Sequence, residues 1–515
     1  MLRFFRSRMR WLLLLVLCAG SMVSSTYATE PDAFADVAAL ASPRRAPDAD
    51  LPRQARAGTG ILGRLNPAAM SAATVSFELP DGRKVHARRQ QRIVDTARSY
   101  QGWVGTFEEQ PGSLAVLGTH RGVTTGFLTY GAELWEILPS GANGQLVLYR
   151  FDDSLLPTAE PVVARKPSVA AAADVAAADA TPEMLALGYV HDLLVVYTPA
   201  ARERYGQGAL ESLVQNAVQA ANQAYRNSGV AITLELVGLQ EVNYAENGDM
   251  KSVLTDLQKT GDGQLDAVHA MRDSVGADIV TLLAETDDSC GIAWSMRGEH
   301  VTAARTAFNV VNPGCLSNQS LAHEIGHNQG NMHDRDSTAN TGAFGYSYGY
   351  RQCTGDGTGF RTIMSYACKG VARVARFSSP QLLYRGSPMG IAYESDPANS
   401  SDNVRSMNNT ADTVSAFRTL PGLRQAAPPE RLSVWTSAPA TVVLNWFDAA
   451  GNESGYKVER SANGIDFEQV ALLGPDSTRY VDQQPGDATR YYYRVRAFNG
   501  RGNSPYSEVR DVGMW

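Results

Sequence analysis

The periodicity of hydrophobic and polar positions changes several times along the chain. Across residues 60–150, short apolar runs alternate with polar positions and are separated by Gly and Pro, a pattern typical of β-strands. The runs are residues 74–77, 114–117, 126–128, 134–137 and 146–149. We therefore expect a small β-rich unit, with its outer bounds at residues 29–154.

After residue 188, segments with the pattern of a strand alternate with segments that have the pattern of a helix. Residues 193–197 read as a buried strand, and residues 210–226 have apolar positions at helical spacing up to Gly229. A strand at 232–237, a helix at 264–275 and a strand at 278–283 follow, and the last helix spans 402–420. Strands that alternate with helices predict an α/β unit with a largely parallel sheet over residues 188–421.

Two segments without this pattern divide the chain. Residues 155–187 are rich in Ala and Pro, and such a segment buries too little apolar surface to hold a unique fold. It predicts a linker, with an Ala-rich helix as the alternative. Residues 422–429 form a second predicted linker. Beyond it, short runs at 441–446, 455–461, 467–472 and 491–497 with regular turn signals predict an all-β sandwich over residues 430–515.

The amino terminus resembles a secretion signal. Arg3, Arg6, Arg8 and Arg10 precede an apolar segment of only 13 residues (11–23), and small residues up to Ala28 suit a cleavage site. A membrane span needs about 20 apolar residues, so an uncleaved anchor is the weaker alternative. We expect a signal peptide at residues 1–28, a secreted protein and no stable membrane span.

Composition narrows the function classes. The 515 residues carry a formal net charge of −7, which argues against nucleic-acid binding, where a basic surface is expected. Removal of the signal peptide leaves four of five cysteines, an even number that predicts two disulfides in an exported chain. Loop-closure entropy favours the pairs near in sequence, Cys290–Cys315 and Cys353–Cys368.

One motif carries the predicted chemistry. His323 and His327 lie four residues apart in a predicted helix (residues 321–329), so both can reach one metal ion. Glu324 is placed to take a proton from metal-bound water. Gly330 can adopt the positive φ that reverses the chain and returns His333 as third ligand. Three neutral imidazoles with an open fourth position indicate a catalytic zinc ion.

The alternatives for this motif are weaker. A helix whose histidines only form hydrogen bonds would not need five fixed positions, and three of the eight histidines of the chain fall within this motif. A structural zinc site would need a fourth protein ligand.

With this motif the central unit resembles the metzincin zinc endopeptidases. The family has a methionine turn beneath the metal, which Met364 in the segment 362–366 matches. Asp334 after the third histidine is similar to the adamalysin or reprolysin branch. Tyr366 is similar to the tyrosine of astacins and serralysins that ligates zinc or stabilises the oxyanion. The whole best resembles the bacterial reprolysin-like peptidases, including the peptidyl-Asp type, and residues 428–508 resemble a fibronectin type III domain.

The resemblance also implies a propeptide at residues 29–154. Many such propeptides block zinc with a cysteine, but no Cys lies between residues 29 and 189, so another group must occlude the site. His86, His120 or an acidic side chain are the candidates. Arg165–Lys166 offers a dibasic processing site, and Asp174 and Asp179 suit self-cleavage by an Asp-directed enzyme.

The sequence thus predicts a secreted zinc endopeptidase, made as a zymogen, that acts as a monomer on protein or peptide substrates. An adhesin or matrix-binding protein that uses its type III module is the alternative. Arg361 and Arg373 flank the methionine turn, so they would favour acidic side chains in the substrate. Structural calcium is left open, since no motif in the sequence indicates it.

Overall fold

The computed structural model describes residues 36–95, 98–141, 144–152, 189–286, 288–296, 301–354, 358–368, 371–418, 426–438, 441–453, 455–464, 467–473, 476–483, 488–499 and 502–514. The predicted signal peptide, the linker at 155–187 and the candidate processing sites lie outside these residues. Residues 422–425 of the second predicted linker also lie outside them. Among the described residues, the helices are all too short or too polar to cross a membrane.

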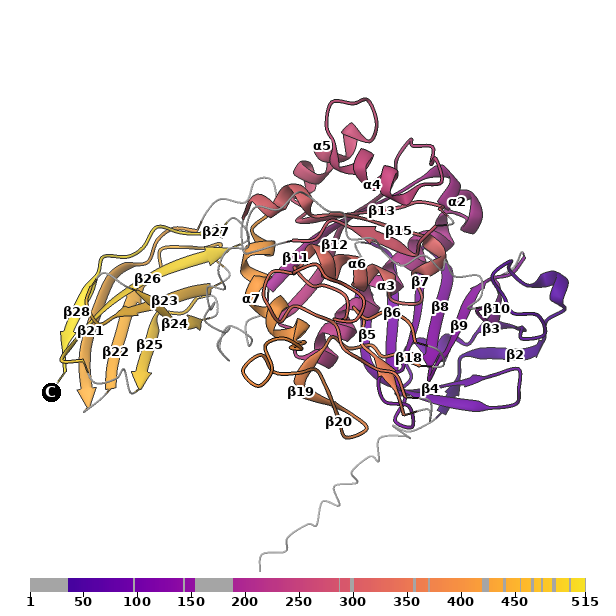
Figure 1. The fold of residues 1–515 in the computed structure, drawn as a ribbon, viewed down its shortest axis with the longest axis horizontal. Helices are drawn as coiled ribbons and strands as arrows, with labels where there is room; N and C mark the ends of the chain where they lie inside the picture. Colours follow the sequence, from indigo (N-terminus) through magenta and orange to yellow (C-terminus); the bar gives the residue numbers. More distant parts are fainter. Residues whose placement is uncertain are drawn as a thin grey trace, which may run out of the picture.

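The amino-terminal unit is one large, mainly antiparallel sheet, drawn indigo to purple in Figure 1. Only β1 and β4 pair in parallel. The strands follow the order β1-β4-β5-β6-β7-β8-β9-β10-β3-β2, with bounds β1 (Asp36–Ala38), β2 (Leu40–Arg45), β3 (Ile61–Leu65), β4 (Thr74–Glu78), β5 (Lys84–Asp95), β6 (Tyr100–Thr106), β7 (Leu114–His120), β8 (Val123–Tyr130), β9 (Glu133–Pro139) and β10 (Gln145–Arg150). Two short 3₁₀ helices, η1 (Asp48–Asp50) and η2 (Pro67–Met70), interrupt the connections.

The central unit contains the predicted α/β sheet. Its order is β12-β11-β13-β15-β14, and every pair is parallel except the edge pair β14–β15, so the sheet is mixed. The strands are β11 (Tyr189–Tyr197), β12 (Ile232–Glu241), β13 (Ile279–Leu283), β14 (Gly291–Ala293) and β15 (Phe308–Val311). The helices are α2 (Pro199–Tyr205), α3 (Gln207–Ser228), α4 (Met250–Gln258), α5 (Asp266–Val275), α6 (Ser320–Asn328) and α7 (Asn403–Ser415), with η4 (Val301–Thr306) and η5 (Pro313–Cys315).

Both faces of this sheet are covered by helices. Leu193, Val195 and Tyr197 of β11 join the apolar cluster that includes α3, α6 and α7. Leu194 and Val196 join the cluster on the other face, with α4 and α5. Burial on both faces explains why β11 has a continuous apolar run instead of an alternating one.

Short strands below α6 complete the central unit. β16 (Arg351–Gln352), β17 (Phe360–Arg361) and β18 (Ala372–Arg373) form a small sheet, and β19 (Ser379–Tyr384) pairs with β20 (Ser387–Met389). The predicted last helix is shorter than expected, because α7 ends at Ser415 instead of residue 420. Three residues after the helix ends, the backbone N–H of Arg418 donates a hydrogen bond to Asp278 at 3.0 Å.

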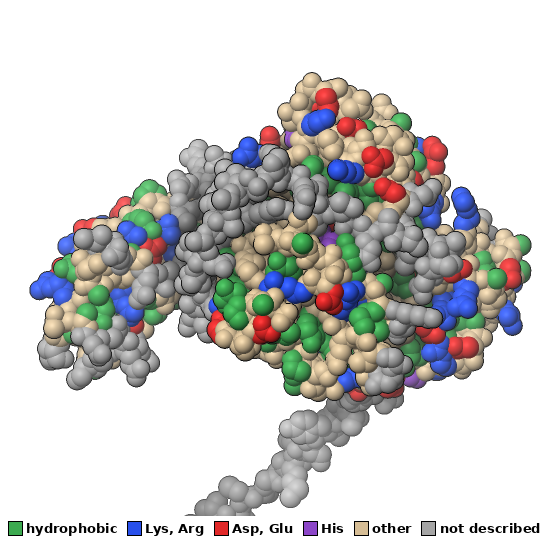
Figure 2. Space-filling view, viewed as in Figure 1, with side chains coloured by type: hydrophobic (Ala, Val, Ile, Leu, Met, Phe, Trp, Pro, Cys, Tyr) green, Lys and Arg blue, Asp and Glu red, His purple; other side chains and the backbone are tan. Residues whose placement is uncertain are grey.

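The carboxy-terminal module consists of two small sheets around the rings of Trp446, Tyr456, Tyr491 and Tyr493. One sheet has the order β21-β22-β25, and the other has β24-β23-β26-β27, with β28 also on β26. The strands are β21 (Glu430–Ala438), β22 (Thr441–Phe447), β23 (Gly455–Ser461), β24 (Glu468–Leu473), β25 (Arg479–Gln483), β26 (Arg490–Asn499), β27 (Gly502–Asn503) and β28 (Arg510–Gly513). Positive and negative side chains are interspersed over the described part of the face in Figure 2.

Helix α3 lies between the central sheet and the amino-terminal sheet. Its contact with the amino-terminal unit includes polar pairs: Asn216 Oδ1 accepts from the Tyr100 hydroxyl at 2.8 Å, and Ser212 Oγ accepts from Thr125 Oγ1 at 2.8 Å. Gly118 allows this close approach, because a Cβ there would lie 1.9 Å from Asn216 Oδ1. His120 bonds Glu211 of α3 at 3.1 Å, so in this structure it is engaged away from the histidine motif.

Candidate active site

Three imidazole rings converge at the end of helix α6. The Nε2 atom of His333 lies 3.1 Å from that of His323 and 2.9 Å from that of His327. The Nδ1–H groups of His323 and His327 donate to the carbonyls of Ile363 and Asn331, both at 2.8 Å. Both Nε2 atoms therefore carry lone pairs that face one another, an arrangement that a shared cation stabilises.

The chain reversal that returns His333 depends on Gly330. Its φ is +94°, and a Cβ at this position would lie 2.7 Å from the Cβ of Ala343. A side chain would thus be opposed by backbone strain and by contact. The structure places the predicted glycine at the predicted turn.

Three polar side chains hold this turn, and the sequence analysis did not identify them. Asn328 donates to the backbone of Trp294 and accepts from Asn309, each at 2.8 Å. Gln329 bonds His191 at 3.0 Å, and Asn331 accepts from Asn403 at 2.9 Å. The signal that could have found them is three amide side chains in a row of buried positions, where polar residues are expected to have specific partners.

Glu324 is fully buried beside the three imidazoles. Among the described residues, neither of its carboxylate oxygens has a hydrogen-bond partner. Burial raises the pKa of Glu324 well above its usual range, and the positive charge of Arg373 partly opposes this. A buried carboxylate without a partner is costly in a folded protein, so it indicates a group held ready for a ligand.

A glycine of the edge strand leaves room for this carboxylate. A Cβ on Gly291 of β14 would lie 2.4 Å from Glu324 Oε1 and 2.6 Å from its Cδ. Strand β14 therefore passes directly over Glu324, at the one edge of the central sheet whose strand runs antiparallel.

Met364 packs beneath the motif, as the resemblance implies. Its side chain is fully buried, and a Cβ on Gly326 would lie 2.5 Å from its sulfur. Gly326, one residue before His327, thus lets the methionine turn pack directly against α6.

Asp334 links the third histidine to the methionine turn. Its Oδ2 accepts from the backbone N–H of Tyr366 at 3.0 Å, and its Oδ1 forms an ion pair with Arg351 Nε at 3.1 Å. The ring of Tyr366 lies against that of His333, with centroids 4.1 Å apart. The structure thus brings all the residues of the predicted site together.

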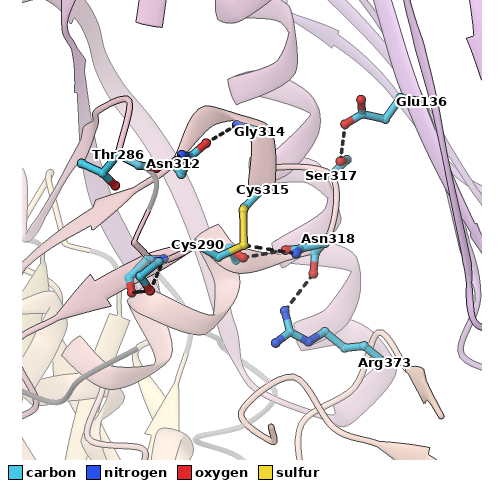
Figure 3. Close-up of a disulfide and its surroundings, with 12 residues drawn as sticks. Glu136, Thr286, Cys290, Asn312, Gly314, Cys315, Ser317, Asn318 and Arg373 are labelled. Atoms are coloured by element: carbon cyan, nitrogen blue, oxygen red, sulfur yellow. Dashed lines mark hydrogen bonds between the residues drawn. A yellow bond between two sulfur atoms is a disulfide. The ribbon is translucent and has the colours of Figure 1, made fainter. Parts of the chain in front are cut away.

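Two disulfides bracket this site. They join Cys290 to Cys315 and Cys353 to Cys368, the pairs favoured by their separation in the sequence. The first connects the residue before Gly291 to the segment that enters α6. Figure 3 shows Asn318 between this disulfide and Arg373: its side chain contacts Cys290 Sγ at 3.7 Å, and its carbonyl accepts from Arg373 at 2.9 Å.

Arg361 and Arg373 lie side by side near the imidazoles. They are register partners in the parallel pair β17–β18. The charge of Arg373 lowers the pKa values of His323, Glu324 and His333, and that of Arg361 also lowers the pKa of His323, although burial is the largest cause of each histidine shift. Both guanidinium groups therefore act on the site electrostatically.

The sequence of this chain is similar to those of known proteins. A family model described as "Metallo-peptidase family M12" matches residues 189–378. A peptidyl-Asp metalloendopeptidase of Stenotrophomonas maltophilia is 33% identical over 69% of this chain and 85% of its own length. The chain belongs to metallopeptidase family M12.

A second relative of this M12 peptidase has the same name and is also similar in sequence. A peptidyl-Asp metalloendopeptidase of Xanthomonas campestris pv. campestris is 36% identical over 60% of this chain and 70% of its own length. The activity is that of a zinc metalloendopeptidase, and the adhesin alternative is not favoured. An Fn3-like protein from Clostridium thermocellum is 30% identical over 17% of this chain and 91% of its own, with a TM-score of 0.16, so the nature of the carboxy-terminal module stays a prediction.

The residues present fit a zinc ion. The donor set of three histidine nitrogens suits zinc, and burial lowers the pKa values of His323, His327 and His333, which keeps the rings neutral as metal ligands must be. The carboxylate oxygens of Glu324, which bond no described residue, are explained if a bound water accompanies the ion.

Replacement of Gly291 by Ala tests the role of the edge strand in the M12 peptidase. The added methyl group must displace the Glu324 carboxylate, and a shift of about 1 Å in a reacting group lowers the rate by about 100-fold. We expect caseinolysis to fall by about this factor while zinc content, measured by atomic absorption, is unchanged. Gly513→Ala, where a Cβ meets nothing within 4 Å, is the control. Full activity in Gly291→Ala would contradict this placement of Glu324.

Proposed function

We propose that this zinc endopeptidase is exported as a zymogen and cleaves protein substrates at peptide bonds next to aspartate. The observation that carries the catalytic part is the convergence of three imidazoles beside the buried carboxylate of Glu324, which has no hydrogen-bond partner in the part of the chain that the structure describes. The names of the relatives supply the aspartate preference, and two adjacent arginines near the site support it.

His323, His327 and His333 would hold the zinc ion. Bound zinc lowers the pKa of a coordinated water and polarises a peptide carbonyl. Glu324 would accept a proton from that water and then donate it to the amine that leaves, because it is the carboxylate beside the three rings. The hydroxyl of Tyr366, on the ring that lies against His333, would stabilise the developing oxyanion. Met364 forms the apolar base of the site.

The arginine pair would recognise the substrate carboxylate. A guanidinium group forms short, paired hydrogen bonds with a carboxylate, and two such groups favour Asp or Glu over uncharged side chains. Arg373 is held by the carbonyl of Asn318 at 2.9 Å, and Arg361 donates to the carbonyl of Ser365 at 3.0 Å. These contacts orient both side chains. The disulfide-bonded segment that contains Asn318 therefore helps to position Arg373.

The amino-terminal unit would act as the propeptide. It contacts the segments that hold Arg373 from two sides: Glu136 accepts from Ser317, and Gly112 O accepts from the N–H of Ala375 at 2.9 Å. The Glu136–Ser317 contact is visible in Figure 3. Latency would thus depend on docking against the wall of the site, since the unit has no cysteine to bind zinc.

The carboxy-terminal module would be a fibronectin type III-like domain that is attached to the peptidase. Lys457 of β23, which is buried, bonds Asp412 of α7 at 3.1 Å. The module therefore contacts α7, a helix that packs on the same face of the central sheet as α6. We expect it to place the enzyme on substrates or surfaces.

Replacement of Glu324 by Ala tests the catalytic part. The variant should keep stoichiometric zinc, because the three imidazoles remain, but lose proteolysis by about 100-fold or more, since it lacks the proton acceptor. Caseinolysis and metal content of the purified protein measure both effects. Wild-type activity should also disappear with a chelator. If the variant retained most of its activity, the assigned role of Glu324 would be wrong.

Replacement of Arg361 or Arg373 by Gln tests the specificity. Each loss removes a charged hydrogen bond worth about 1.5–3 kcal/mol, so cleavage next to Asp should fall by about 10- to 100-fold. Cleavage sites in a peptide library, read by mass spectrometry, give the preference. Arg376→Gln is the control, since its guanidinium bonds the Leu383 carbonyl, away from the site. A variant that carries both Arg361→Gln and Arg373→Gln and still prefers Asp as the wild type does would contradict the assignment.

The first residue of the secreted protein tests the zymogen. We expect the active enzyme in the culture medium to begin between residues 165 and 190, where the dibasic pair and Asp174 and Asp179 lie. Amino-terminal sequencing measures this. If processing is self-cleavage, the Glu324→Ala protein should keep residues 29–154. A mature start far from this range would exclude the proposed boundary.

A further inference from the structure

A buried chain of polar side chains lies behind the end of α6, away from the reacting groups. The Gln329 side chain donates to His191 Nδ1 at 3.0 Å and accepts from the Tyr225 hydroxyl at 3.2 Å. His191 Nε2 then donates to the carbonyl of Ala411 at 3.0 Å. The chain therefore connects four elements, namely α3, the end of α6, strand β11 and helix α7.

Every member of this chain has a defined orientation. Both ring nitrogens of His191 are used, so its tautomer is fixed with the proton on Nε2. His191, Gln329 and Tyr225 are each completely buried, in or beside the main apolar cluster. Burial lowers the pKa of His191 to about 4, so the ring is neutral near neutral pH and serves as a fixed hydrogen-bonding group.

The chain is attached to the turn between two predicted metal ligands. Gln329 follows His327 by two residues and immediately precedes Gly330, where the backbone reverses toward His333. Its carbonyl also accepts from Thr410 Oγ1 of α7 at 2.9 Å. Tyr225 stacks on Phe377 with centroids 5.6 Å apart, and Phe377 lies 3.6 Å from the position of a Cβ on Gly326. Both sides of the helix end are thus supported by the same group of residues.

Apolar side chains would fill this space at lower cost. A buried amide and a buried imidazole lose their hydration, and their hydrogen bonds recover only part of that loss. What the polar pair adds is direction, because hydrogen bonds fix the rotation of Gln329, whereas a packed aliphatic chain can shift. Outer-shell partners that orient metal ligands commonly change metal affinity by 10- to 100-fold.

We propose that His191, Gln329 and Tyr225 are positioning residues for the zinc site, which hold the end of α6 so that His327 and His333 meet at the correct distance. This inference rests on the proposed assignment of the three histidines as zinc ligands. It differs from a purely structural role, because zinc affinity should depend on the polar chain even when stability does not.

The test compares zinc affinity with stability in the full-length chain, in a Glu324→Ala background that prevents self-cleavage. The variants are His191→Leu, Gln329→Met, and the triple variant His191→Leu, Gln329→Met, Tyr225→Phe. Competition with a chromogenic chelator gives zinc affinity, and the thermal midpoint of the metal-free protein gives stability. Asn222→Leu is the control, since Asn222 is a buried amide of α3 that bonds only Leu234 among the described contacts, at 2.7 and 2.9 Å.

We expect both single variants to lose stability and to bind zinc 10- to 100-fold more weakly, because each leaves a buried partner unpaired. The triple variant should recover stability relative to the single variants and still bind zinc at least 10-fold more weakly. Asn222→Leu should lose stability and keep its zinc affinity within 3-fold.

Two outcomes would overturn the inference. If the triple variant bound zinc within 3-fold of the parent, we would conclude that the polar chain only fills space. If Asn222→Leu lost zinc affinity as strongly as the single variants, we would conclude that zinc affinity merely follows global stability. A parent protein that bound no zinc would instead contradict the proposed function itself, so the two failures are distinguishable.

Discussion

The whole central unit depends on one electrostatic constraint, namely that three imidazole lone pairs and a buried carboxylate must be held together. The Nε2 atoms of His323, His327 and His333 face one another, and Glu324 is buried with no hydrogen-bond partner among the described residues. Such an arrangement persists only if the surrounding structure is rigid enough to oppose relaxation. The cost is distributed over the fold and is recovered when an ion and its water bind.

The surroundings show how this rigidity is built. Each residue between His327 and His333 that carries an amide side chain is bonded to a different element: Asn328 to the β14–β15 edge, Gln329 to β11 and α3, and Asn331 to α7. Asp334 then ties the returning chain to the methionine turn, and Cys290–Cys315 ties the edge strand to the entrance of α6. Glycines at 291 and 326 let a strand and the methionine approach α6 more closely than any side chain allows.

The set of metal ligands could be predicted from the sequence because its signal is local. Two histidines one helical turn apart, a glycine and a third histidine express the metal geometry within eleven residues, and cysteine separation sufficed to favour the disulfides that the structure contains. The residues that support the site could not be predicted from local spacing. Asn318, His191 and Gly291 act through contacts between distant segments, and neither spacing nor periodicity records such contacts. The end of α7 was missed for the same reason, because Asp278, directly before β13, accepts a hydrogen bond from the Arg418 N–H.

The interface on α3 bears on the proposal that the amino-terminal unit is a propeptide that is removed. Glu211, Ser212 and Asn216 face that unit with polar groups, which water can satisfy equally well once the unit is gone. Apolar residues of the unit, such as Val116 and Phe127, still belong to the same cluster as α3, so the contact is mixed in character. An interface of this kind is closer to a separable contact between domains than to a divided core. If the amino-terminal unit is removed as proposed, the polar groups of α3 remain on the surface of the enzyme, where water can satisfy their hydrogen bonds.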